Sequence, residues 1–128
     1  MTGARKEMPK PNLMYDDLRP NSTLARAAES NAHTIGMKVD SVPRGLSGGV
    51  STDFGNDSQR MPSFVMAFAV AEEPMPVQSR LLTETAKSSL AQESAINTAK
   101  VLAITVCDLL ANPDLVEAAR AEFAERDV

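Results

Sequence analysis

Apolar residues recur at helical spacing in three stretches of this chain. The first predicted helix spans residues 22–35, because Asn21 or Ser22 can cap its free N–H groups and an apolar face follows. The second predicted helix spans residues 89–110 and follows a pair of serines that can cap it. A last helix is predicted from Asn112-Pro113, since asparagine caps well and proline is tolerated at the first helical position.

Between these helices, residues 63–70 form a continuous apolar run of strand length. Such a run is typical of a strand buried on both faces of an α/β sheet. The apolar stripe of the second predicted helix should lie against that sheet; its members are Ala95, Ala99, Leu102, Val106 and Leu109. The pattern therefore predicts an α/β fold in which one or a few strands are packed by a long C-terminal helix.

Residues 37–61 are long for a loop in a compact domain, and the stretch 47–58 within them is rich in glycine and short polar side chains. Its polar residues can bond to neighbouring backbone groups or to a ligand; they include Ser51, Thr52, Asp53 and Asn56. Loops of this kind often carry function. The same composition also fits a plain connecting turn.

The composition narrows the class of protein. The chain has 128 residues, of which 43% are hydrophobic, so it can form one globular domain with a modest core. The net charge of −4 argues against a nucleic-acid surface. We find no uninterrupted apolar stretch long enough for a membrane span and no apolar core of a secretory signal, so we expect a soluble, cytoplasmic protein.

Few residues offer catalytic chemistry. His33 is the sole histidine; we expect it to be exposed near a helix C-terminus, with a metal ligand as the alternative. Cys107 is the sole cysteine and is expected to be a buried, inert thiol. The pair Glu72-Glu73 precedes a proline, which is typical of a solvated turn rather than of an acid and base. No common metal, redox or phosphate-binding motif is present.

One stretch resembles a known family. Ser51-Thr52-Asp53-Phe54-Gly55-Asn56-x-Ser58 is similar to the Ser-Thr-Asp-x-Gly-Asn-Val-Ser signature of zinc amidohydrolases of the aminoacylase and p-aminobenzoyl-glutamate hydrolase type, metallopeptidase family twenty. Weaker motifs extend the resemblance over roughly residues 13–125, including Thr83-Glu84-x-Ala86 and Thr98-Ala99-Lys100. The resemblance implies the C-terminal third of a zinc-exopeptidase-like catalytic domain, preceded by a helix from the lid domain.

Pro9, Pro11 and several charges predict a flexible tail over residues 1–12. By the resemblance, residues 13–40 would be a remnant of the lid domain and residues 41–128 the C-terminal part of the catalytic domain. Ser51, Thr52, Asp53 and Asn56 would line the substrate pocket. The family's zinc-ligating histidine falls at Gln78, and a second family histidine falls at Val65. Glutamine is a poor substitute for imidazole on zinc.

The resemblance therefore implies a truncated relative that is catalytically inactive alone. The family uses zinc, but we expect no cofactor, metal ligand or catalytic residue in this chain, because the remaining ligands and the catalytic glutamate belong to the part it lacks. The family reaction is hydrolysis of the amide bond of N-acyl amino acids or dipeptide-like substrates. An alternative is an interaction module or accessory subunit that self-associates or docks on a full-length amidohydrolase. A third possibility is a hydrolase whose site is completed by a partner subunit.

Overall fold

The computed structural model describes residues 14–39 and 52–125, and these ranges contain helices but no strands. The helices are α1 (Ser22–Thr34), α2 (Phe54–Ser58), α3 (Arg80–Thr85), α4 (Ser89–Ala111) and α5 (Pro113–Ala124). The predicted α/β fold class is therefore wrong for the described part of the chain. The predicted tail over 1–12 and residues 40–51 of the predicted loop over 37–61 lie outside the described residues.

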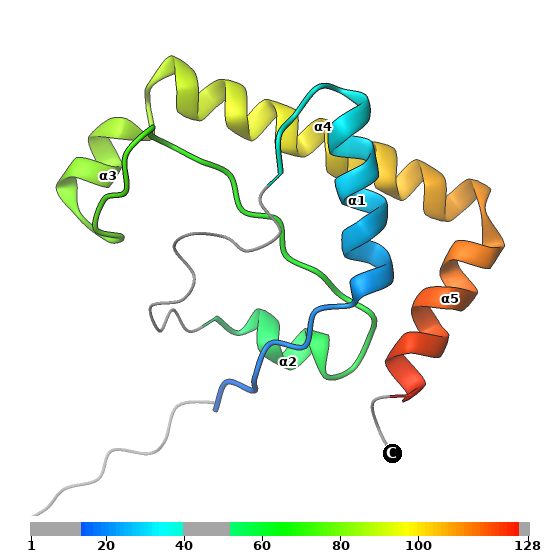
Figure 1. Cartoon of the computed structure of the whole chain (residues 1–128). Helices are drawn as coiled ribbons and strands as arrows, with labels where there is room; N and C mark the ends of the chain where they lie inside the picture. Colours follow the sequence, from blue (N-terminus) through cyan, green and yellow to red (C-terminus); the bar gives the residue numbers. More distant parts are fainter. Residues whose placement is uncertain (1–13, 40–51, 126–128) are drawn as a thin grey trace, which may run out of the picture.

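The core lies where α1, α4 and α5 meet. Helix α4 crosses α1, and α5 turns back beside the start of α1 (Figure 1). Ala28, Ala32 and Val101 are buried at the α1–α4 contact, and Phe64 and Met66 pack against them. Two of these three buried side chains are alanine, so the two helices can approach closely but bury little apolar area.

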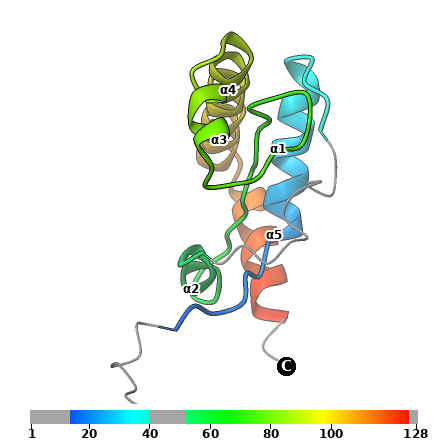
Figure 2. The same ribbon diagram turned by 90° about the vertical axis from the view of Figure 1, so that its left-hand side faces the viewer.

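The strand predicted from the apolar run over 63–70 is not found, because residues 62–69 have no regular secondary structure. The segment runs between α2 and α3 and passes across α1 and α4 (Figures 1 and 2). Phe64 and Met66 face the core, whereas Val65 is 46% exposed. Among the hydrogen bonds between described residues, none involves the backbone of residues 64–75. A strand is defined by its ladder to a neighbouring strand, and the described ranges supply no such neighbour.

The predicted packing face of α4 is also wrong. Leu102 and Val106, expected to lie against a sheet, are 41% and 53% exposed. The buried side chains of the helix instead include Thr98, Val101 and Thr105, which lie on the side that meets α1. Periodicity identified the helix correctly, but α1 covers a narrower and more polar side than the apolar stripe suggested.

The predicted helix starts are confirmed. Asn21 caps α1 by accepting a hydrogen bond from the N–H of Leu24 at 3.0 Å. Ser88 caps α4 in the same way, and Asn112 caps α5 with Pro113 at its first position. These caps are local contacts between a side chain and the backbone two or three residues on, which is why the sequence pattern predicts them.

Candidate functional site

The signature stretch is described from Thr52 onward, and Ser51 lies outside the described residues. Thr52 and Asp53 are exposed at the start of the short helix α2. The hydroxyl of Thr52 accepts a hydrogen bond from the N–H of Phe54 at 3.3 Å, and the side chain of Asp53 does not cap the helix. Of the four predicted pocket residues, these two are placed where a ligand or a partner could reach them.

The side chain of Asn56, the fourth predicted pocket residue, is hydrogen-bonded to the backbone of the segment that precedes α1. Its Oδ1 accepts a hydrogen bond from the N–H of Asp16 at 2.8 Å, and its Nδ2 donates to the carbonyl of Met14 at 3.3 Å. Gly55 lies against the same segment, because a Cβ atom added there would collide with the backbone carbonyl of Asp16. The glycine of the signature is thus required for close approach of two backbones.

The end of α2 continues this contact. The Ser58 hydroxyl accepts a hydrogen bond from the N–H of Arg19 at 2.9 Å and donates to the carbonyl of Gly55 at 2.6 Å. Gln59 receives a hydrogen bond from the Arg19 side chain at 3.0 Å and donates to the carbonyl of Asp17 at 2.6 Å. Hydrogen bonds from α2 and Gln59 therefore hold residues 14–19, the segment that leads into α1. The amides and hydroxyls of Asn56, Ser58 and Gln59 are used for this purpose.

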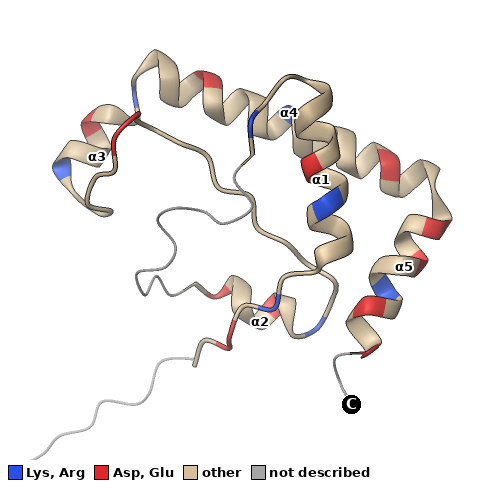
Figure 3. Cartoon of the chain, in the orientation of Figure 1, with Lys and Arg blue, Asp and Glu red and all other residues tan. Residues whose placement is uncertain are grey.

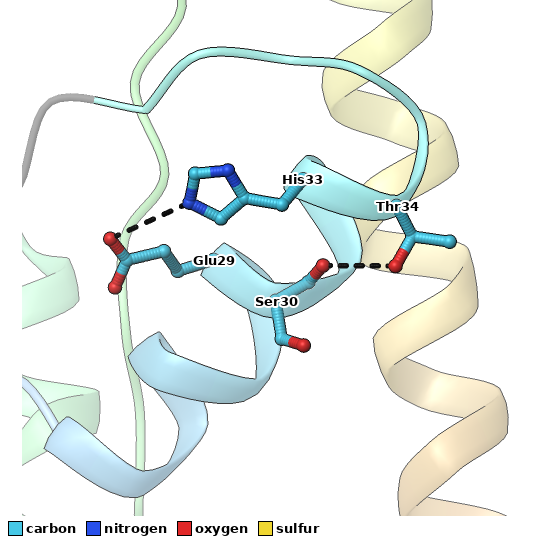
Figure 4. A network of polar contacts seen from close by, with 4 residues as sticks. All are labelled: Glu29, Ser30, His33 and Thr34. Carbon is cyan, nitrogen blue, oxygen red and sulfur yellow. Dashed lines mark hydrogen bonds and ion pairs between the residues drawn. The ribbon is translucent and has the colours of Figure 1, made fainter.

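The described residues do not fit a zinc ion. Gln78, at the place of the expected family histidine, is exposed and lies in a turn with a left-handed φ of 57°. His33 is exposed, as predicted, and its Nε2 lies 3.9 Å from a carboxylate oxygen of Glu29 one turn earlier (Figure 4). Within the described ranges, no group of three or more histidine, cysteine, aspartate or glutamate side chains could hold a metal.

Other candidate groups are placed as follows. Glu72 and Glu73 are both exposed, in agreement with a solvated turn.

Cys107 is exposed, so the expectation of a buried thiol is wrong. Its neighbours along α4 are mostly apolar, but Cys107 lies away from the side of the helix that α1 covers. A shallow apolar hollow between α1, α4 and α5 includes Leu24 and Val116, and none of the predicted site residues lines it.

A carboxylate for which the sequence indicated no role holds the start of α1. The two carboxylate oxygens of Glu122 accept hydrogen bonds from the N–H groups of Ser22 and Thr23, both at 2.7 Å. Burial tends to raise the pKa of Glu122, but these backbone hydrogen bonds outweigh it and lower the pKa from 4.5 to about 2. Asn21 also donates from Nδ2 to the carbonyl of Ala119 at 2.9 Å. The first turn of α1 is thus docked on α5.

A second polar cluster joins α1 to α4. The Nδ2 group of Asn31 donates to Thr105 Oγ1 at 3.1 Å and to Asp108 Oδ2 at 2.7 Å. Thr105 also donates to the carbonyl of Val101 within its own helix at 2.8 Å. This cluster explains why Thr105 and Asp108 can lie on the side of α4 that meets α1. The separation of 74 to 77 residues between its members gives no local sequence signal.

The chain is similar to curated dipeptidases. It is 38% identical over 112 residues to a mouse (Mus musculus) protein named Xaa-Arg dipeptidase, and 34% identical over 112 residues to the human (Homo sapiens) protein of that name. Each match covers 85% of this chain but 25% of the relative, so the chain spans about a quarter of the length of these relatives. No family model and no solved structure matches. The similarity supports a relationship to a peptidase family, without pointing to the aminoacylase type in particular.

Proposed function

We propose that this chain is a partial relative of zinc-dependent peptidases and amidohydrolases that does not hydrolyse a substrate alone. The similarity to two proteins named Xaa-Arg dipeptidase supports the family, and the coverage of about a quarter of their length supports the partial character. The reaction of such a family is hydrolysis of an amide bond in an N-acyl amino acid or dipeptide-like substrate. For a close relative of the matched proteins, a dipeptide ending in arginine is the substrate to try first.

The chemistry of the described residues carries this proposal. Zinc-assisted hydrolysis requires a metal-bound water and a base that takes its proton. In the part of the chain that the structure describes, the ion-pair partner of His33 is the partly exposed Glu29, and Gln78 offers no imidazole. Asn56, the best-positioned amide of the signature, is already hydrogen-bonded on both of its polar atoms. In this proposal Gly55, Asn56 and Ser58 hold residues 14–19 in place by hydrogen bonds and close backbone contact, and they supply no catalytic group.

The test is metal content and hydrolysis measured on the same sample. We expect the purified chain, incubated with zinc and then desalted, to retain far less than one zinc per chain by elemental analysis. We also expect no release of free arginine from Xaa-Arg dipeptides above a buffer blank. Stoichiometric zinc together with arginine release would refute the proposal.

A second candidate function is that of an accessory subunit that completes a site on a full-length relative. Thr52 and Asp53 favour this function, because both are exposed at the start of α2. Mixing the chain with a full-length dipeptidase should then change the rate of hydrolysis, and Asp53→Ala should abolish the change. The exposed Asp57 on the same helix provides the control variant Asp57→Ala. An effect that is equal in both variants, or absent with the native chain, would contradict this role.

A further inference from the structure

We propose that the outer face of α4 is the docking surface for a second copy of this chain, with the two helices crossing antiparallel. The outer face consists of Ile96, Ala99, Ala103, Val106 and Leu110. This inference concerns association alone and does not depend on the proposed loss of hydrolysis.

The outer face is continuous and open to solvent. Its members follow one another at alternating steps of three and four residues, which places them on one side of a helix. Ile96, Val106 and Leu110 are 57%, 53% and 82% exposed. Helix α1 lies on the other side, where Thr98, Val101 and Thr105 are buried. Within the described residues, no other element covers this apolar stripe of four turns.

Charged side chains avoid the outer face. Helix α4 carries only Glu93, Lys100 and Asp108 as charged residues, so most of its ribbon is uncharged in Figure 3. The helical spacing places all three to the side of the outer face or near α1. Asp108 accepts a hydrogen bond from Asn31 of α1. Two copies can therefore meet through this face without burying a charge or bringing like charges together, both of which would oppose association.

The sizes of the side chains favour a second copy of the same helix. The small residues Ala99 and Ala103 lie at the middle of the face, and larger residues lie on both sides of them. Two helices that cross approach most closely at the crossing point and diverge towards their ends. In an antiparallel pair centred between the two alanines, Ala99 meets Ala103 of the other copy, and Ile96 meets Val106. Small side chains then lie where the space is narrow and large ones where it widens.

The available area predicts a weak, reversible dimer. The outer face runs from residue 96 to residue 110, which is ~22 Å of helix, so a stripe roughly 10 Å wide offers about 220 Å² per copy. Stable interfaces bury about 800 Å² per partner. The outer face alone falls short of this value, so we expect a dissociation constant of roughly 10–100 μM rather than an obligate dimer.

A membrane is a poorer occupant of this face. By length and composition α4 could cross a membrane, and only 17% of the relevant stretch is buried. The core helix of a soluble protein can meet the same criteria of length and composition. Crossing would also carry Glu93, Lys100 and Asp108 into hydrocarbon and separate Asp108 from Asn31.

The first experiment measures molar mass by light scattering on a size-exclusion column, from about 1 to about 500 μM protein. We expect the mass to rise from one chain to two across this range. Ala103→Glu should keep the chain monomeric throughout, because it places a charge at the crossing point. Ala86→Glu makes the same change at an exposed alanine outside α4 and should dimerise like the native chain. Circular dichroism confirms that both variants keep their helices.

The single exposed cysteine reports the orientation of the helices. A nitroxide label on Cys107 should show an inter-label distance of roughly 20 Å in the antiparallel dimer, because the two labels lie about twelve residues apart along the axis. A parallel pair would bring the labels to roughly 10 Å. A short distance, a monomer at every concentration, or unchanged dimerisation of Ala103→Glu overturns the proposal. Binding of the monomer to phosphatidylcholine vesicles would identify the membrane as the occupant instead.

Discussion

The replacement Glu122→Gln tests how α1 is held on α5. In the native chain the carboxylate accepts the N–H groups of Ser22 and Thr23, and the side chain of Asn21 accepts that of Leu24. The N–H of Asn21 itself donates to the carbonyl of Ser63 at 2.7 Å. All four free N–H groups of the first turn of α1 are thereby satisfied. Glutamine keeps one oxygen acceptor but loses the negative charge and the second acceptor. We therefore expect Glu122→Gln to lower the free energy of unfolding without changing the fold.

The magnitude follows from the pKa of Glu122. One pKa unit is equivalent to ~1.4 kcal/mol, so lowering the pKa from 4.5 to about 2 corresponds to about 3 kcal/mol between the two protonation states. The carboxylate is partly exposed, and solvent screening reduces the expected loss to ~1–2 kcal/mol. This value agrees with the loss of a charged partner at a helix N-terminus.

The dependence on pH has a definite sign. Because the pKa of Glu122 is lower in the folded state, its contribution to stability is complete above pH 4.5 and is lost as the pH falls towards about 2. Urea unfolding followed by circular dichroism at 222 nm should therefore show the native chain and Glu122→Gln converging over this range. The exposed Glu125 of the same helix region supplies the control Glu125→Gln, which should leave the stability unchanged. A difference between native chain and Glu122→Gln that persists undiminished at pH 2 would refute the reasoning.

Three further predictions concern single positions. Gly55→Ala should destabilise the chain by ~2–4 kcal/mol in a thermal melt, because the new Cβ collides with the carbonyl of Asp16; a loss under 0.5 kcal/mol would show that the α2 contact is not formed. Gln78→Gly should raise the free energy of unfolding by up to ~1 kcal/mol, since glycine adopts the φ of 57° without strain, and a decrease would contradict that backbone conformation. Thr98→Val should raise the urea midpoint by an amount equivalent to ~1 kcal/mol, because the buried hydroxyl has no hydrogen-bond partner among the described residues; a lower midpoint would indicate a partner.

Local signals in the sequence predicted the local structure well. The helix over 22–35 is found as Ser22–Thr34, and the helix over 89–110 as Ser89–Ala111. Both predictions rest on a capping side chain and on apolar periodicity, which involve residues within one or two turns of each other. His33 is exposed in the last turn of α1, as its place away from the apolar face of the helix predicted. Interactions of this range are encoded in consecutive residues and need no knowledge of the rest of the fold.

The errors concern which surfaces meet. The run over 63–70 was predicted to be a strand, but it forms none, and the described ranges contain no strand that could pair with it. The apolar stripe of α4 was expected to be covered, whereas α1 packs on the side that holds Thr98 and Thr105. The type of an apolar residue indicates a preference for burial, but it does not indicate which other element will cover that residue. For the same reason Cys107, in an apolar helix, is exposed.

The sequence by itself determined where α1 and α4 begin and end and where α5 begins, but it did not predict α2 or α3. It also marked residues 51–58 as a special stretch. Only the tertiary structure decided that Gly55 and Asn56 clamp the segment before α1, and that Glu122 closes the first turn of that helix. These contacts join residues 39 to 100 positions apart. A hydrogen bond at such a separation depends on the path of the whole chain, so the physical chemistry of neighbouring residues cannot reveal it.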